Sequence, residues 1–202
     1  MSGTRHLAVT AGLVTALVVA GCTGNGEAFA PAGLFGPPVA TTYDATMDET
    51  ARALADIDAA HDEASLKAAT MRLHERAKDG DARAQFAYAL ALRSGRGVER
   101  DDGQAVEWLL QAAAQNDPGA QYQLGIAHRE GRGVPQDERA ALDWFERAAA
   151  LGHAEAQYIA GAAYLKGQGA KPDNAWAVRW LGKAAYQGVP EAQYLMALAN
   201  AS

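Results

Sequence analysis

The sequence predicts an all-α solenoid of repeated helix pairs, and three spacings carry this prediction. Glutamines recur every 36 residues, at positions 85, 121, 157 and 193. Tryptophans recur at the same interval, at Trp108, Trp144 and Trp180, and glycine pairs follow at 95 and 97, 131 and 133, and 167 and 169. Self-similarity at a fixed period of a few tens of residues indicates a repeat protein, in which each unit buries its apolar face only by stacking on its neighbours.

Each repeat reads as two helices, and the second repeat shows this most clearly. Apolar residues at helical spacing predict a first helix over residues 119–130. The glycine-rich loop 131–136 cannot continue that helix, and Asp137 stands at the N-cap position of a second helix over residues 138–151. The small residues Gly125 and Gly161 are predicted to lie where a neighbouring helix approaches closely. The predicted repeat core also contains Trp108, Trp144 and Trp180.

The amino terminus has the composition of a signal peptide. Arg5 precedes an apolar to weakly polar run, residues 7–20, which suits a secretory h-region and is too short to cross a bilayer as a helix. Small residues then lead to Cys22. This pattern resembles the lipobox of bacterial lipoproteins, which implies cleavage before Cys22, acylation of that residue (palmitate among the chains) and anchoring in the membrane.

This resemblance implies that the protein is located in the bacterial cell envelope. Thr23 follows the cysteine, which resembles sorting to the outer membrane with the protein facing the periplasm. Cys22 is the only cysteine in the sequence, so no intramolecular disulfide can form. Loss of Arg5 takes the formal net charge from −6 to −7, and such acidity excludes a typical nucleic-acid binder.

The glycine- and proline-rich stretch after the cysteine predicts a flexible tether, and helical spacing begins at Asp44. The first helix pair is degenerate, with Arg72 where the repeat tryptophan should stand. The expected segments are 1–21 (signal peptide), 22–43 (lipidated cysteine and linker), 44–81 (degenerate helix pair), 82–117, 118–153 and 154–189 (repeats) and 190–202 (capping helix).

The repeat motif resembles a known family. The segment 119–125, Gly-Ala-Gln-Tyr-Gln-Leu-Gly, followed by Gly-x-Gly-Val, Asp, Trp and Ala-Ala, is similar to Sel1-like repeats, relatives of tetratricopeptide repeats. The resemblance covers about 120 residues. It implies a right-handed α/α superhelix that serves as an adaptor for other proteins. A cysteine-rich branch linked to penicillin binding is not matched, because no repeat here contains cysteine.

Few residues suggest chemistry. The histidines at 61, 74, 128 and 153 form no pair at metal-ligand spacing, and no serine lies in a nucleophile motif, so we expect no metal, no cofactor and no catalytic residue. The acidic pairs have a capping role that recurs with the repeat. Trp176 lies outside the tryptophan register and is expected to be partly exposed.

The sequence therefore favours a binding scaffold for an envelope protein or peptide. The positions between the patterned ones are expected to line a concave surface: Leu90, Ala91, Ser94, Gln123, Ala127, Glu130, Ile159, Ala163 and Lys166. One alternative is a structural component that self-associates through residues 190–202, where apolar side chains leave little polar surface. A wall-active or penicillin-recognising enzyme ranks third.

Overall fold

The computed structural model confirms the all-α prediction. The chain divides into two units, residues 1–39 and 40–202, and the structure describes residues 42–200. The predicted signal peptide, Cys22 and the linker up to residue 41 lie outside the described residues. The helices are α1 (Thr42–Ala59), α2 (Glu63–Lys78), α3 (Ala82–Ser94), α4 (Asp102–Ala114), α5 (Pro118–Glu130), α6 (Glu138–Ala150), α7 (Ala154–Lys166), α8 (Asn174–Tyr186) and α9 (Pro190–Asn200).

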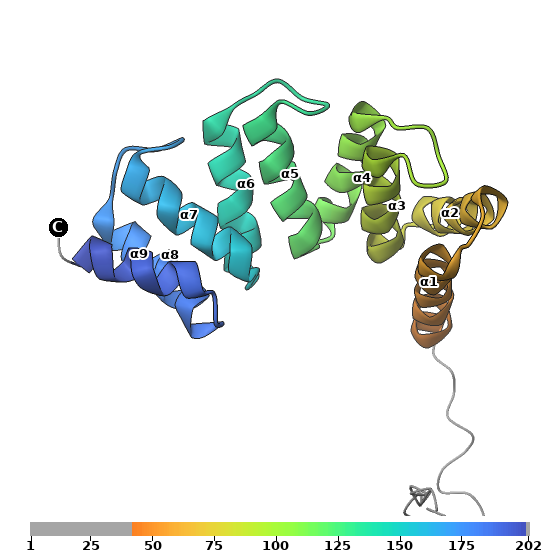
Figure 1. The fold of residues 1–202 in the computed structure, drawn as a ribbon, viewed down its shortest axis with the longest axis horizontal. Helices are drawn as coiled ribbons and strands as arrows, with labels where there is room; N and C mark the ends of the chain where they lie inside the picture. Colours follow the sequence, from red (N-terminus) through yellow and green to blue (C-terminus); the bar gives the residue numbers. More distant parts are fainter. Residues whose placement is uncertain (1–41, 201–202) are drawn as a thin grey trace, which may run out of the picture. The chain divides into compact units, whose positions relative to one another are not determined.

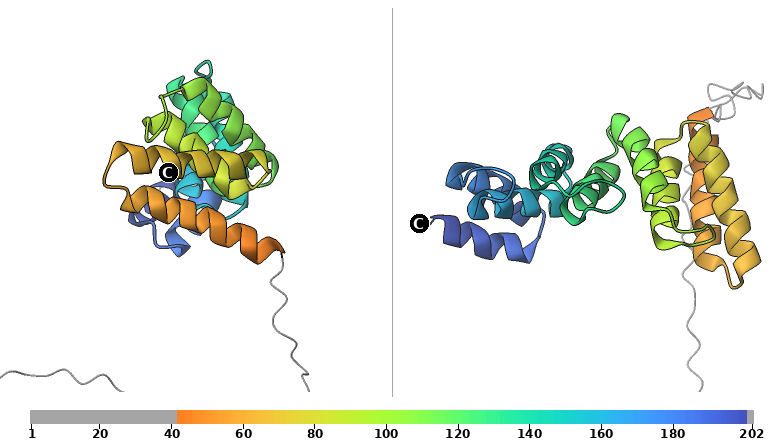
Figure 2. Two further views of the ribbon diagram at one scale, coloured as in Figure 1. Left: turned by 90° about the vertical axis from the view of Figure 1, so that its right-hand side faces the viewer. Right: turned by 90° about the horizontal axis from the view of Figure 1, so that it is seen from above.

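The helices stack in chain order as antiparallel pairs (Figures 1 and 2). In each repeat the first helix (α3, α5 or α7, here called helix A) packs on the second (α4, α6 or α8, helix B), and helix B packs on the next helix A. The helix after α8 is α9, which packs on α8 and touches α7. Many fully buried side chains are alanines, such as Ala112, Ala120 and Ala148, so neighbouring helices can approach closely.

The repeated aspartates and glycines set the ends of the helices, as their spacing predicts. Asp101, Asp137 and Asp173 are the N-caps of α4, α6 and α8, and each carboxylate accepts from backbone N–H groups of the first turn. These backbone hydrogen bonds hold the pKa of Asp101 and of Asp137 below the usual value. Each helix A ends at a glycine in the left-handed conformation, the first of each loop pair.

The predicted core residues divide into two groups. Gly125 and Gly161 are buried where helix B crosses helix A: a β-carbon at Gly161 would lie 2.6 Å from Leu181 Cγ. Trp180 is also buried, at 6% exposure. Trp108 and Trp144 are only half-buried and pack against the edge of the core. The three tryptophans are evenly spaced in the sequence, but they are buried to different depths because different side chains cover each ring.

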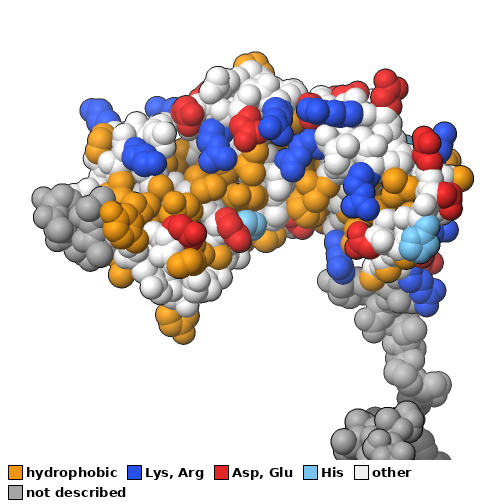
Figure 3. Space-filling view, viewed as in Figure 1, with side chains coloured by type: hydrophobic (Ala, Val, Ile, Leu, Met, Phe, Trp, Pro, Cys, Tyr) orange, Lys and Arg blue, Asp and Glu red, His pale blue; other side chains and the backbone are white. Residues whose placement is uncertain are grey.

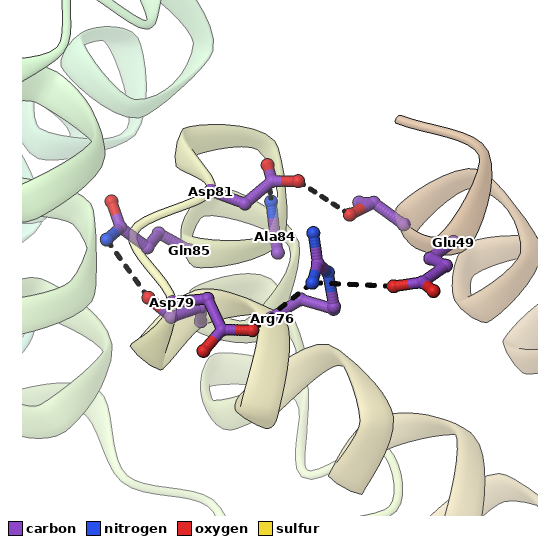
Figure 4. Close-up of polar contacts among 8 residues, drawn as sticks. Glu49, Arg76, Asp79, Asp81, Ala84 and Gln85 are labelled. Atoms are coloured by element: carbon purple, nitrogen blue, oxygen red, sulfur yellow. Dashed lines mark hydrogen bonds and ion pairs between the residues drawn. The ribbon is translucent and has the colours of Figure 1, made fainter. Parts of the chain in front are cut away.

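The recurring glutamines tie each repeat to the one before it. Gln85, Gln121 and Gln157 are buried, and each side-chain amide donates to a carbonyl in the last turn of the preceding second helix. Figure 4 shows this contact for Gln85 at the end of α2. Each of these carbonyls already accepts one backbone N–H, as Ala77 does from Gly80, and the glutamine adds a second hydrogen bond that links the two helices.

A second glutamine completes the link in two of the three repeats. Gln115 donates to Gln85 Oε1 at 2.9 Å and to the Gly80 carbonyl at 2.9 Å. Gln187 donates in the same way to Gln157 Oε1 at 2.8 Å and to the Gly152 carbonyl at 2.9 Å. In the middle repeat the equivalent residue is Leu151, and Gln121 Oε1 is buried without a hydrogen-bond partner among the described residues.

Leu151→Gln should therefore stabilise the protein by about 1 kcal/mol, because it supplies a donor to a buried acceptor and removes an exposed leucine. The measurement is the urea midpoint at unchanged m-value. Leu151→Ala is the control, since it removes the same leucine without adding the donor. Equal stability of the two variants would contradict the proposed link.

The degenerate first pair is joined to the repeats by a polar junction (Figure 4). The Thr50 hydroxyl on α1, fully buried, donates to Asp81 Oδ2 at 2.7 Å, and Asp81 also caps α3. Arg76 Nη1 on α2 lies 3.4 Å from Glu49 Oε2 and 3.2 Å from Asp79 Oδ2. These contacts hold α1 and α2 against the start of the first repeat.

Candidate functional site: the helix A face

The nine surface residues expected from the sequence fall into three classes. Leu90, Gln123 and Ile159 are half-buried on the outward side of α3, α5 and α7. Ser94, Glu130 and Lys166 are exposed at the ends of the same helices. Ala91, Ala127 and Ala163 are buried, at 6%, 6% and 7% exposure. The first two classes lie on one surface, and the third lies largely beneath it.

The prediction that Ala91, Ala127 and Ala163 offer exposed side chains to a partner is therefore wrong, although Ala91 and Ala127 line hollows on this surface. Ala91 follows Ala84 by seven residues, two helical turns, and both are buried, Ala84 in the core and Ala91 at the base of a hollow beside α1. An arginine at Ala127 or Ala163 would bring a guanidinium into this packing and would unfold the repeat. Such variants cannot test partner binding.

The surface residues are found by taking equivalent positions, 36 residues apart, in all three repeats. Leu90 is equivalent to Ile126 and Ala162, and all three are half-buried on the same side. Ile126 was not among the predicted surface residues, although adding the 36-residue period to Leu90 leads to it. We call the outward surface of α3, α5 and α7 the helix A face; it comprises Phe86, Ala87, Leu90 and Arg93, then Tyr122, Gln123, Ile126 and Arg129, then Tyr158, Ile159, Ala162 and Leu165.

Apolar and basic groups are separated on this face. Figure 3 shows hydrophobic side chains in a band across it, with Lys and Arg side chains above the band and Asp and Glu side chains among them. The aromatic position (Phe86, Tyr122, Tyr158) is half-buried in every repeat. Arg93 and Arg129 occupy one position in the first two repeats, and the loop residues Arg96 and Arg132 share another. A partner thus meets apolar area and cations on the same face.

Two hollows open along this surface. One, of about 160 Å³, lies between α1 and α3, with Ile57 and Leu90 in its wall and Arg96 at its rim. The other, of about 10 Å³, lies beside α5 and has Ile126, Arg93 and Arg132 in its wall. A larger hollow of about 510 Å³ lies between α1 and α2, but its lining is mostly charged side chains, some of them paired with one another, such as Arg72 with Asp56.

His153 replaces the aspartate that caps the other helix A segments. Its Nδ1 accepts from the Ala156 N–H at 3.3 Å, and its ring stacks on Tyr122 with 4.4 Å between centroids. Nδ1 also lies 3.3 Å from Glu155 Oε2, a contact that needs a protonated ring. Burial lowers the pKa of His153 although Glu155 and Asp117 oppose this, so the neutral, capping form prevails near neutral pH.

Stability should therefore fall as the pH falls below the unfolded-state pKa of histidine. A folded-state pKa below 6.5 means that the stabilising contribution is complete above pH 6.5 and is lost as the pH falls through the folded-state value. His74, whose pKa burial also lowers, adds to the effect. His153→Asn keeps a capping oxygen without a titrating group, so its Tm should drop less than wild type between pH 7.5 and 5.5.

His61→Asn is the control for this titration, because His61 is exposed in the α1–α2 loop. Its Tm should follow the wild-type pH profile. If the pH dependence of Tm were the same for His153→Asn and wild type, His153 would not contribute to the loss of stability at low pH.

Trp176 is exposed, at 40%, as its place outside the repeat register suggested. Its ring stacks between Tyr164 and Trp180, with centroids 6.1 Å and 6.3 Å away, and the Arg179 guanidinium lies 4.8 Å from its centroid. Burial and a hydrogen bond to Glu146 raise the pKa of Tyr164 to about 12. The phenol thus stays protonated and donates to Glu146, which indicates a packing role for this cluster.

The described residues provide no metal site and no membrane span. Among residues 42–200 no three His, Cys, Asp or Glu side chains lie close enough together to hold a metal ion. None of the described helices has the length and apolarity needed to cross a bilayer.

Comparison with known proteins identifies the repeats. The Sel1 repeat model matches residues 82–117, 118–153 and 154–189, more than half of the chain. The chain belongs to the Sel1 repeat family. Its matched windows are the same three that the 36-residue spacing marks in the sequence. No curated protein sequence matches it.

Solved Sel1 repeat structures resemble this fold. A Sel1 repeat protein from Oxalobacter formigenes is 40% identical, with a TM-score of 0.59 over 62% of this chain and 95% of that one. A protective antigen of uropathogenic Escherichia coli, c5321, is 28% identical, with a TM-score of 0.69 over 75% of this chain. The match spans only 32% of the antigen. Helicobacter pylori cysteine-rich protein B, at 21% identity and a TM-score of 0.53 over 66% of this chain and 96% of that one, shares the fold.

Proposed function

We propose that this protein is a lipid-anchored, non-enzymatic Sel1 scaffold that binds a protein or peptide on the helix A face in the bacterial envelope. The observation that carries the proposal is the continuous half-buried apolar band over α3, α5 and α7, represented by Leu90, Ile126 and Ile159. Contiguous apolar surface bordered by polar groups is typical of protein interaction sites. Solenoids commonly use such extended surfaces for binding.

The envelope part of the proposal is supported by sequence alone. The apolar run 7–20 and the small residues before Cys22 resemble a lipoprotein signal. Acyl chains on Cys22 would tether the repeats, and Thr23 favours the outer membrane with the protein facing the periplasm. Cys22→Ala should abolish labelling by an alkyne analogue of palmitate and move the protein out of the membrane fraction. Unchanged labelling would refute the anchor.

The binding part is tested by a matched pair of variants. Ile126 lies on the helix A face, whereas Leu110 is 44% exposed on α4, a helix B. The tagged protein is crosslinked in the cells that naturally make it, purified and analysed by mass spectrometry. Ile126→Ser should lose a reproducible partner that Leu110→Ser retains, with both variants folded by circular dichroism. Equal capture by both would contradict the proposed surface.

Self-association through residues 190–202 is the second candidate. Tyr186 and Tyr194 are 94% and 71% exposed near the end of the described array, which favours contact with another surface there. Leu195 and Met196 are half-buried against the α8–α9 core and contribute less than the sequence suggests. Tyr194→Ser should abolish any concentration-dependent dimer in light scattering; a wild-type monomer at all concentrations would exclude this candidate.

A further inference from the structure

We propose that the partner of the helix A face is an extended acidic peptide segment, whose carboxylates meet Arg93 and Arg129 while its apolar side chains meet Leu90 and Ile126. This inference rests on the proposed function, since it names the chemistry of the partner that the same surface would bind.

The sequence places a cation beside an apolar residue in each of two successive repeats. Arg93 follows Leu90 by three residues on α3, and Arg129 follows Ile126 by three residues on α5. Residues three apart in a helix lie on one face, so each repeat presents the same apolar-then-cationic pair. The third repeat has Ala162 and Leu165 at these two positions, and its nearest cation is the exposed Lys166 at the end of α7.

The two arginines are half-buried, and neither lies within ion-pair distance of a carboxylate among the described residues. Arg93 donates to the side-chain oxygen of Gln123, and the Arg129 guanidinium lies 5.4 Å from the Phe145 ring centroid. These contacts orient the guanidinium groups and leave each without a carboxylate in ion-pair contact among the described residues. An incoming carboxylate can accept two parallel N–H bonds from such a group, the strongest side-chain pairing available.

The loop arginines extend the positive strip but are partly neutralised. Arg132 Nε lies 3.0 Å from Glu130 Oε2, and Arg96 Nη2 lies 3.9 Å from Asp58 Oδ1. The whole chain has a formal net charge of −6, so a basic strip here is local and does not reflect overall composition. Figure 3 shows Lys and Arg side chains over α3 and α5 on this face, with Asp and Glu side chains among them. Complementary charge at a rim speeds association and rejects partners of like sign.

A peptide fits these features better than a nucleic acid does. The strip is short and borders an apolar band, and the acidic remainder of the chain would repel a long polyanion. An extended peptide alternates its side chains and can offer carboxylates to the strip and apolar groups to the band at the same time.

The test uses the full chain and a fluorescent peptide of about twelve residues, with Glu at every third position among Leu and Ser. Its matched probe carries Gln in place of Glu. Anisotropy at low salt should give at least about tenfold tighter binding of the Glu peptide, and added salt should reduce the difference as it screens the charges. Arg93→Gln with Arg129→Gln should remove this preference, whereas Arg139→Gln, on the exposed start of α6, should keep it.

Equal binding of the two peptides, or a preference that survives the double arginine variant, would overturn the acidic partner. Tighter binding of a single-stranded DNA oligonucleotide of similar charge would overturn it as well. If Ile126→Ser weakens peptide binding and the arginine variant does not, the helix A face remains the binding surface and only the acidic selectivity is wrong. If neither variant weakens binding, both proposals fail.

Discussion

Gly125→Ala should destabilise the protein by about 3 kcal/mol, the upper end of what overpacking a core costs. A β-carbon at Gly125 would lie 2.6 Å from two ring carbons of Phe145, and real side chains do not approach so closely. Either α5 and α6 must separate or the Phe145 ring must leave its place, and Phe145 is 2% exposed. Chemical denaturation of the two proteins at one pH measures the difference.

The first repeat indicates how the loss can be repaired. There the equivalent residues are Ala89 and Leu109, buried at 1% and 2% exposure, so in that repeat an alanine packs opposite a leucine, whereas in the third repeat a β-carbon at Gly161 would lie 2.6 Å from Leu181 Cγ. Phe145→Leu should therefore cost less in the Gly125→Ala background than in wild type. We expect a coupling of about 1–2 kcal/mol in the double-mutant cycle. Additive effects would show that the two side chains do not compete for the same space.

Gly133→Ala should also cost about 3 kcal/mol or more, since it combines two penalties, left-handed strain and overpacking. Gly133 has φ +69°, and its β-carbon would lie 2.2 Å from the Asp102 carbonyl oxygen in the first turn of α4. That neighbour is backbone and cannot turn aside. Gly169 is in the same situation, 2.3 Å from the Glu138 carbonyl oxygen at the start of α6.

Gly152→Ala is the control, because Gly152 has φ +95° but no atom within 4 Å of the added β-carbon. Only left-handed strain remains, so the loss should be about 1 kcal/mol. Both variants are compared by their urea midpoints at a common m-value. Equal losses would mean that the close approach of the loop to the preceding repeat contributes nothing.

These contacts explain why the second glycine of each loop recurs. Gly97, Gly133 and Gly169 each lie against the first turn of the second helix in the preceding pair: a β-carbon at Gly97 would lie 2.8 Å from the Leu66 carbonyl oxygen. The first glycine of each loop ends helix A, and the second lets the loop touch the repeat before it. The Gly-x-Gly motif thus serves both the local turn after helix A and the packing of one repeat against the next.

The repeat period predicted most of the fold because the recurring features are either local in the sequence or join residues at a fixed spacing within one repeat. The aspartate caps, the left-handed glycines and the close approach at Gly125 follow from residue type and position within one unit. The hydrogen bond missing at Gln121 could not be foreseen, since it depends on Leu151, which lies 30 residues away at the end of the second helix of the same repeat. Equal spacing also could not show that Trp108 and Trp144 are less buried than Trp180.

The binding surface was predicted less well, and the reason is geometric. A shift of one residue turns a helix position by about 100 degrees, so Ala127 belongs to the core while Ile126 belongs to the surface. Arg93 and Arg129 attracted no notice in the sequence, because charge alone does not separate a solvated side chain from one held on an apolar face. The lipid anchor at Cys22 lies outside the described residues and stays a prediction.

Photo-crosslinking from single positions shows whether a partner lies on the helix A face. A photoreactive phenylalanine is introduced at Ile126 or Ile159 on the helix A face, and at Leu110 on α4 as the control, in the cells that naturally make the protein. We expect one discrete heterologous adduct from both helix A positions and none from Leu110. An adduct from Leu110 alone, or the same adducts from all three positions, would contradict a binding site on the helix A face.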